Sequence, residues 1–272
     1  MLKQFKATNY KILLSSATIM AASVLFACGL NGTKLPTLVH VSEESNVDGS
    51  FLISSILCQR LRISNVGTLL VCLQHGYQHY TKAGMRLGYD CNVFVGKTLS
   101  VLDPLTDIAR DFPVSNWLIS GDTNIADVLL QEIKKQIMGT NFSVRTHNTI
   151  IIDNLAILYN LGASKEDVQM FFNDLMHLTK QMDNLSLITK MSNSDIFCVE
   201  DSNISKCSLV HVNVLNLKSG LFHEVDGKLL IKRCQDENDD NCDWNVTTKE
   251  VLYKVNERNI KIYNPGEIGI KA

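Results

Sequence analysis

A turn near residue 45, between an apolar run and a helical pattern, holds the residues best placed for chemistry. It reads Ser42-Glu43-Glu44-Ser45-Asn46-Val47-Asp48-Gly49-Ser50. A strand-to-helix turn of this kind can hold phosphate, because backbone N–H groups and the positive helix end face the anion. Nucleotide binding is therefore the first chemistry to test against the residues.

The turn lacks most of the side chains that a phosphate-binding loop needs. Such a loop reads G-x-x-x-x-G-K-[ST], with a lysine for the phosphates and a hydroxyl for magnesium. When Gly49 is placed at the second glycine, Glu44 stands at the first, Ser50 at the lysine and Phe51 at the hydroxyl position. The carboxylates, Asp48 among them, would repel an anion. We predict a degenerate loop that binds no nucleotide in the usual way.

A second feature resembles the magnesium-binding segment of nucleotide hydrolases. The apolar run 149–152 ends at Asp153, and a carboxylate at such a strand end helps to hold magnesium in those enzymes. On its own, an aspartate there can equally cap a turn. Together with the degenerate loop, it predicts a P-loop-type fold that has lost its catalytic parts.

Aromatic and basic residues follow the second apolar run. Two His at spacing four could bind metal on a helix, but no neighbouring carboxylate or Cys completes a ligand set. We therefore expect a surface that meets a partner or RNA, made of His75, Tyr77, His79, Tyr80, Lys82 and Arg86. The sequence offers no catalytic nucleophile, and we predict no catalytic, cofactor-binding or metal-binding residue.

Composition sets wider limits on function. The chain has 272 residues, 45% hydrophobic and 20% charged, which suits one large folded domain. Its net charge of -2 excludes a positive field over the whole surface, so RNA binding would need a local patch. The 8 Cys form no C-x-x-C pair. They predict buried thiols rather than a zinc site or a disulfide framework.

The first thirty residues favour a different reading. Lys3, Lys6 and Lys11 precede an uncharged run over 12–30, which is the order of a secretory signal, and 25–28 resembles a lipoprotein cleavage box. The alternative is an extension without a targeting role. We assign 1–34 to an N-terminal extension and expect no membrane contact unless this segment is a true signal.

The rest of the chain, 35–272, reads as one α/β domain. Continuous apolar strands alternate with helices, which predicts a mostly parallel central sheet flanked by helices, and the C-terminal part predicts antiparallel hairpins. The predicted strands are 37–41, 68–73, 92–95, 149–152, 185–189, 211–217, 228–233, 251–255 and 260–263, with turns at 226–227 and 256–259. The predicted helices are 50–62, 79–87, 125–138 and 165–181, the last with a capping arrangement of Ser164 and Asp167. An acidic loop is expected at 236–240.

Several short stretches in this order resemble the Elongator complex protein 6 family. They are 48–53, 78–80, 84–88, 151–155 with 161–162, 225–229 and 253–255. The resemblance runs from about residue 35 to near the end, with gaps around 97–124 and 236–248, and no part of 1–34 maps onto it.

The resemblance implies a RecA-like fold without a working phosphate loop, and a subunit that is not an enzyme. It implies a hetero-hexameric ring with the fourth and fifth Elongator subunits, bound to the catalytic Elongator subcomplex. The ring would bind tRNA and support wobble uridine modification, in the cytoplasm and also the nucleus. Two alternatives remain: an active ATPase with a noncanonical loop, and an exported or lipid-anchored binding protein.

Overall fold

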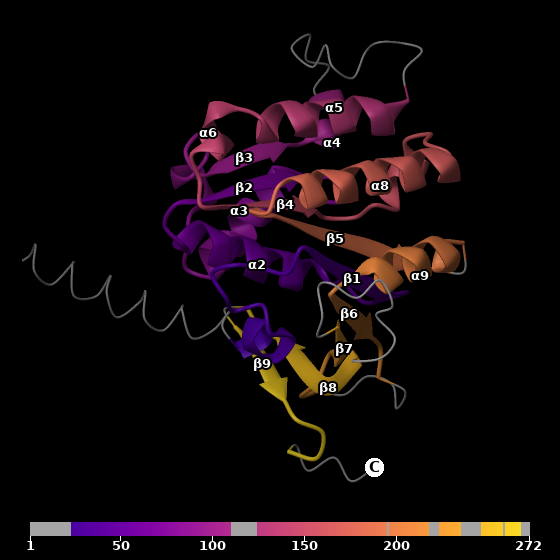
Figure 1. Cartoon of the computed structure of the whole chain (residues 1–272). Helices are drawn as coiled ribbons and strands as arrows, with labels where there is room; N and C mark the ends of the chain where they lie inside the picture. Colours follow the sequence, from indigo (N-terminus) through magenta and orange to yellow (C-terminus); the bar gives the residue numbers. More distant parts are fainter. Residues whose placement is uncertain are drawn as a thin grey trace, which may run out of the picture.

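The fold is built on one nine-stranded sheet, seen in the computed structural model of the chain (Figure 1). The structure describes residues 23–109, 124–194, 196–217, 223–234, 246–257 and 259–267. The strand order is β3-β2-β4-β5-β1-β6-β7-β8-β9. The strands are β1 (Leu38–Glu44), β2 (Val66–Val71), β3 (Leu99–Leu102), β4 (His147–Ile152), β5 (Leu185–Asn193), β6 (Val210–Leu215), β7 (Gly227–Cys234), β8 (Val246–Val255) and β9 (Ile260–Tyr263).

The sheet is parallel from β3 to β6 and antiparallel from β6 to β9. This confirms the predicted α/β class, a mostly parallel sheet that finishes in antiparallel strands. Of the parallel strands, β1, β2, β4 and β5 are buried along nearly their whole length, which explains the apolar runs in their sequences.

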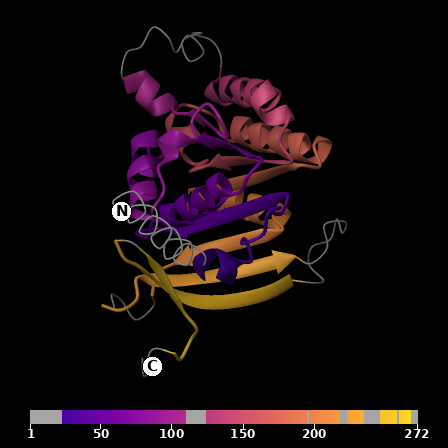
Figure 2. The ribbon, with the colours of Figure 1, turned by 90° about the vertical axis from the view of Figure 1, so that its left-hand side faces the viewer.

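Helices cover both faces of the parallel part (Figure 2). The helices are α2 (Ser50–Arg62), α3 (Tyr77–Arg86), α4 (Pro104–Ala109), α5 (Ile125–Ile137), α6 (Thr140–Ser143), α7 (Ile157–Asn160), α8 (Lys165–Gln181) and α9 (Cys198–Cys207), with a 3₁₀ turn η1 (Cys91–Val93). Helices α2 and α3 pack on one core cluster, and α5 and α8 on the other. Because Ser164 and Asp167 form the predicted capping box, α8 begins where the sequence indicated.

Two local predictions were wrong. The apolar stretch 92–95 is no strand: the Asp90 carboxylate accepts a hydrogen bond from Asn92 N at 2.9 Å and starts η1, and the strand forms later, at β3. The pair 226–227 does not form the expected turn, because Gly227 already belongs to β7. A Cβ on Gly227 would lie 2.6 Å from Leu215 O and 2.8 Å from the Tyr253 hydroxyl, so the glycine permits close approach of strands. The turn at 256–259 is present, closed by Asn256 N and Asn259 O at 2.8 Å.

The described part of the N-terminal segment packs on the core. Residues 23–28 are helical, and Val24, Leu25, Cys28 and Leu30 belong to the cluster beneath α2. Residues 1–22 and the acidic loop at 236–240 lie outside the described residues, and the boundary at residue 35 stays a prediction. Among the described residues, no helix combines the length and apolarity needed to cross a membrane. Of the seven described cysteines, Cys28, Cys58, Cys72 and Cys91 are buried as predicted, whereas Cys198 and Cys207 are exposed.

Candidate functional site

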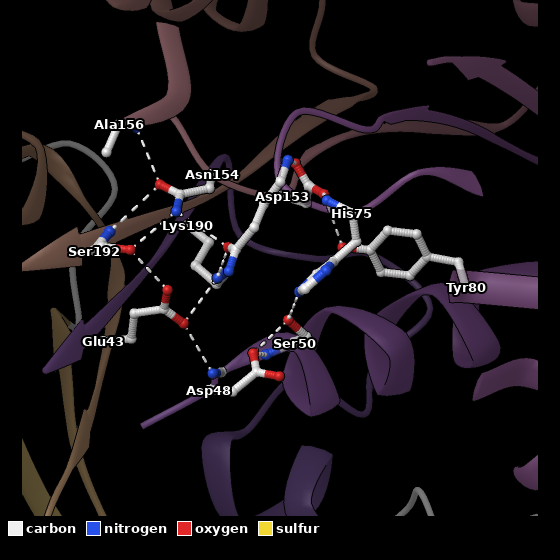
Figure 3. A network of polar contacts seen from close by, with 12 residues as sticks. Glu43, Asp48, Ser50, His75, Tyr80, Asp153, Asn154, Ala156, Lys190 and Ser192 are labelled. Carbon is white, nitrogen blue, oxygen red and sulfur yellow. Dashed lines mark hydrogen bonds and ion pairs between the residues drawn. The ribbon is translucent and has the colours of Figure 1, made fainter. Parts of the chain in front are cut away.

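The degenerate loop encloses a carboxylate that belongs to the protein itself. Glu43 lies at the carboxyl end of β1, on the face that α2 covers, and only 4% of it is exposed. One carboxylate oxygen accepts a hydrogen bond from Gly49 N at 2.9 Å, at the start of α2. The other accepts one from the Ser192 hydroxyl at 2.8 Å (Figure 3). The N–H of the residue just before the helix thus faces an internal anion.

The cation that pairs with this carboxylate comes from a neighbouring strand. Lys190 of β5 is completely buried, and its Nζ lies 2.7 Å from the Gly49-bound oxygen of Glu43. The same ammonium donates to the Gln74 side-chain oxygen at 2.6 Å. Because β5 lies beside β1 in parallel register, with Glu43 opposite Ser192, the two side chains meet at one edge of the sheet. A helix N–H and an ammonium, the groups that hold phosphate in nucleotide-binding loops, therefore bind Glu43 here.

The five predicted loop positions play structural parts. Gly49 is the N-cap of α2, and a Cβ there would lie 3.3 Å from the Glu43 carboxylate. Asp48 accepts hydrogen bonds from both the backbone N–H, at 2.8 Å, and the hydroxyl of Ser50. Burial alone would raise the pKa of Asp48, but these bonds and the Lys190 charge hold it below its ordinary value. Glu44 is exposed and accepts from Asn216 N at 2.8 Å, and Phe51 packs against Tyr253.

Asp153 is committed to holding the loop that follows β2. Its carboxylate accepts from the backbone N–H groups of residues 73, 74 and 75 at 2.6, 2.9 and 3.0 Å. The Tyr80 hydroxyl donates a fourth bond at 3.0 Å. Burial raises the pKa of Asp153, while these hydrogen bonds act in the opposite direction. The Walker-B-like position thus serves as a cap for a turn, the structural reading that the sequence had left open.

A polar network links the two halves of the site. The Asn154 amide donates to the Gln74 side-chain oxygen at 3.1 Å and to the Ser192 hydroxyl at 2.9 Å. Its oxygen accepts from Ala156 N at 3.0 Å. Since Gln74 and Ser192 also bind Lys190 and Glu43, the network holds this ion pair from several sides (Figure 3).

The six residues of the predicted partner surface differ in how far they are exposed. Tyr80 is fully buried against Asp153, which contradicts its assignment to a surface. His75 and Tyr77 are half-buried, and the His75 imidazole lies 3.0 Å from the Ser50 hydroxyl. His79 is exposed and stacks on His75 with ring centroids 4.1 Å apart. Partial burial, and after it the neighbouring His75, lowers the pKa of His79.

The two remaining members of that predicted surface, Lys82 and Arg86, are exposed on α3. They lie about one turn apart on the same helix as His79, and the two cations form a small exposed basic face. The structure brings together the degenerate loop, His75 and the Asp153 turn, and places this face beside them.

The two residues at the centre of the site, Glu43 and Lys190, are not among the predicted site residues. From the sequence, Glu43 is one of the loop carboxylates expected to repel an anion, and Lys190 follows directly after the predicted strand 185–189. The available signal was a lysine placed directly after a predicted buried strand and before Met191, because an ammonium that becomes buried needs an anionic partner.

Chemically, the Glu43 carboxylate occupies the position where an anion such as phosphate would bind. A phosphate approaching Gly49 N would have to displace a carboxylate that already has three donors, Gly49 N, Lys190 Nζ and the Ser192 hydroxyl. Neither Ser50 nor Asp153 is left for a magnesium ion, since each is held by hydrogen bonds within the protein.

Comparisons with known proteins agree with this fold. A KaiC-like protein from the archaeon Pyrococcus horikoshii matches with a TM-score of 0.56 at 9% identity, covering 85% of this chain and 91% of that one. An uncharacterised protein of the same archaeon, in complex with an unknown peptide, matches with a TM-score of 0.54 at 12% identity, covering 85% and 92%. These likenesses show a RecA-type fold.

The sequence comparison identifies the family. No family model matches the chain. Elongator complex protein 6 of Drosophila melanogaster is 57% identical over 254 residues, which span 93% of this chain and 100% of that protein. The chain therefore belongs to the Elongator complex protein 6 family.

Proposed function

We propose that the chain is a non-catalytic subunit of the Elongator complex. In this proposal it joins the fourth and fifth subunits in a hetero-hexameric RecA-like ring, and the ring binds the catalytic Elongator subcomplex and tRNA. The assembly supports modification of wobble uridines in the cytoplasm, and also in the nucleus. Identity with the fly protein along nearly the whole chain supports membership of the complex.

One observation carries the non-catalytic part of the proposal. The Glu43 carboxylate takes the Gly49 N–H and the Lys190 ammonium, the two kinds of donor that a nucleotide phosphate would require. Phosphoryl transfer depends almost entirely on positioning and charge stabilisation of the phosphates. A loop whose donors already bind an internal carboxylate has no means of supplying either.

The RecA-type fold supports the assembly part. RecA-like sheets with helices on both faces serve as building blocks of rings, and a subunit can keep that shape without keeping a site. The exposed basic face of α3 gives a local positive charge of the kind that RNA contact needs on a chain without net positive charge.

Affinity purification of the tagged full-length chain, followed by mass spectrometry, tests the assembly. We expect enrichment of the fourth and fifth Elongator subunits and of the catalytic subunits, compared with cells that express the tag alone. Native mass spectrometry of the purified ring should give two copies of each of its three subunits. Recovery of the chain without any Elongator subunit would overturn the proposal.

Depletion of the chain tests the role in tRNA modification. Nucleoside mass spectrometry of purified tRNA should show loss of the modified wobble uridines, and re-expression of the chain should restore them. Unchanged modification after complete depletion would contradict the proposed role.

A further inference from the structure

A second buried polar cluster lies on the opposite face of β1 from Glu43. His40 of β1 and His211 of β6 stand opposite each other in the parallel register, with ring centroids 5.6 Å apart. Asp201 of α9 reaches this pair, and its carboxylate lies 2.9 Å from His40 Nε2. Asp201 is 3% exposed, His40 0% and His211 8%. Three elements therefore direct two imidazoles and a carboxylate into one enclosed place.

We propose that His40, Asp201 and His211 form a binding site for a divalent transition-metal ion of the zinc class. Their three ligand atoms all lie within 4.8 Å of one another. Zinc in tetrahedral coordination holds nitrogen and oxygen ligands at about 2.0 to 2.2 Å, so the ligand atoms stand about 3.3 to 3.6 Å apart. Side-chain shifts of about 1.5 Å or less bring the three groups to that spacing.

The surroundings of His40 match what a metal-bound histidine needs. Its Nδ1 lies 2.8 Å from the Thr189 hydroxyl, which holds the ring so that Nε2 points at Asp201. A partner on the far ring nitrogen is typical of histidines that bind metal, because it fixes the ring and leaves the other nitrogen for the ion.

A fourth possible ligand is also present, and it borders a pocket. The Ser42 hydroxyl lies 2.7 and 2.8 Å from the two Asp201 oxygens and 2.8 Å from His211 Nε2. Ser42 also lines a pocket of about 690 Å³ together with Asn193 and Asn213, at the carboxyl ends of β1, β5 and β6. The hydroxyl, or water from the pocket, completes four ligands.

The charges favour an ion as well. A buried carboxylate next to two imidazoles and a hydroxyl carries one negative charge, and a divalent cation bound there would offset the cost of burying it. Imidazole and carboxylate ligands suit zinc, iron, nickel and copper, and the absence of a sulfur ligand from this set separates it from thiolate sites. The sequence did not predict this site, since His40 lies 161 positions before Asp201 in the chain.

The test uses the purified full-length chain with Zn²⁺ as the probe. Competition against a chelating dye should give saturable binding of one ion per chain, and zinc should raise the midpoint of thermal unfolding. Asp201→Asn keeps the shape of the side chain and should weaken binding at least about tenfold, as should His211→Ala. His147→Gln is the matched control, because His147 is another buried histidine of the sheet, bonded to the Ser186 hydroxyl at 3.0 Å. It should bind zinc like the wild type.

Cysteine binding must be separated from this site, and Co²⁺ does so. The cobalt-loaded wild type should show d–d absorption without a thiolate charge-transfer band, and Asp201→Asn should lose that absorption. Retention of about one transition-metal ion per chain through purification, lost in Asp201→Asn, would support the site. Absence of saturable binding, binding that both variants leave unchanged, or a thiolate spectrum would overturn it. If Asp201→Asn does not fold, the spectrum and stoichiometry of the wild type still decide the matter.

Discussion

The Lys190 ammonium and the Glu43 carboxylate lie 2.7 Å apart, and both are almost fully excluded from water. Gly49 N completes the arrangement at 2.9 Å from the same carboxylate oxygen. The carboxylate is tethered to the loop that surrounds it, so it competes with any free anion at a high effective concentration. The position that a nucleotide phosphate would take is thus filled by buried groups of the protein itself.

Glu43→Ala should destabilise the chain by about 3 to 5 kcal/mol, because it leaves a buried ammonium without its anion. Added formate or acetate should restore part of this loss by entering the space that the carboxylate left. Urea unfolding with and without formate measures both effects.

The control for this prediction is Glu44→Ala at the next position. Glu44 is exposed and bonds Asn216, so its removal should cost about 1 kcal/mol or less and respond to formate no more than the wild type does. Equal losses for the two variants, or no effect of formate on Glu43→Ala, would show that the internal ion pair is not what stabilises the loop.

Asp153→Asn should destabilise the chain by about 2 to 3 kcal/mol without creating or removing any nucleotide binding. An amide has one accepting oxygen, whereas the Asp153 carboxylate accepts four hydrogen bonds with two. Thermal unfolding gives the loss of stability. Tyr80→Phe, which removes a single one of these bonds, should cost about 1 kcal/mol. A variant Asp153→Asn as stable as the wild type would contradict a capping role.

His147 should make stability fall in mild acid. Burial first, and then the charges of Arg60 and Lys34, lower the pKa of His147 from 6.5 to about 4. The unfolded chain therefore binds a proton that the folded chain does not between pH 6.5 and 4, so stability is present above 6.5 and is lost as pH falls. Between pH 7 and 5, urea unfolding of His147→Gln should lose about 1 to 2 kcal/mol less than that of the wild type. An identical pH dependence in the two proteins would contradict this assignment.

If the proposed ring binds tRNA, the exposed basic face of α3 should contribute to that binding. Replacing Lys82 and Arg86 by Ala should reduce the slope of log affinity against log salt by about 2, since each phosphate contact contributes about one. Both residues are exposed, so stability should stay within about 0.5 kcal/mol. Lys135→Ala on α5 is the control and should leave the slope unchanged. If the double variant binds tRNA with wild-type affinity at every salt concentration, this face does not contact the RNA.

Much of the fold could be predicted from the sequence because the parallel strands are buried on both faces. Their continuous apolar runs marked β1, β2, β4 and β5, and the capped amphipathic pattern marked α8. Helix α9 was missed, since Ser, Asn and Cys residues of weak helix propensity fill it and Ile204 is its one buried apolar residue.

The centre of the site could not be predicted because its partners are distant in the chain. Glu43 and Lys190 are 147 positions apart and meet only through the β1 and β5 pairing. The sequence shows which positions of the phosphate-binding loop lack the usual residues. It does not show that the Glu43 carboxylate lies where a nucleotide phosphate would bind. The same limit applies to His40, Asp201 and His211, which the strand order brings together.

Isothermal titration of the purified chain with ATP and magnesium tests the central claim most directly. Because the internal carboxylate occupies the loop, we predict no saturable heat from the chain alone up to millimolar ATP. The chain in complex with its partners should add no binding beyond what the partners show by themselves. Saturable binding of ATP to the lone chain, with the nucleotide's phosphates competing for the Gly49 N–H, would contradict the account.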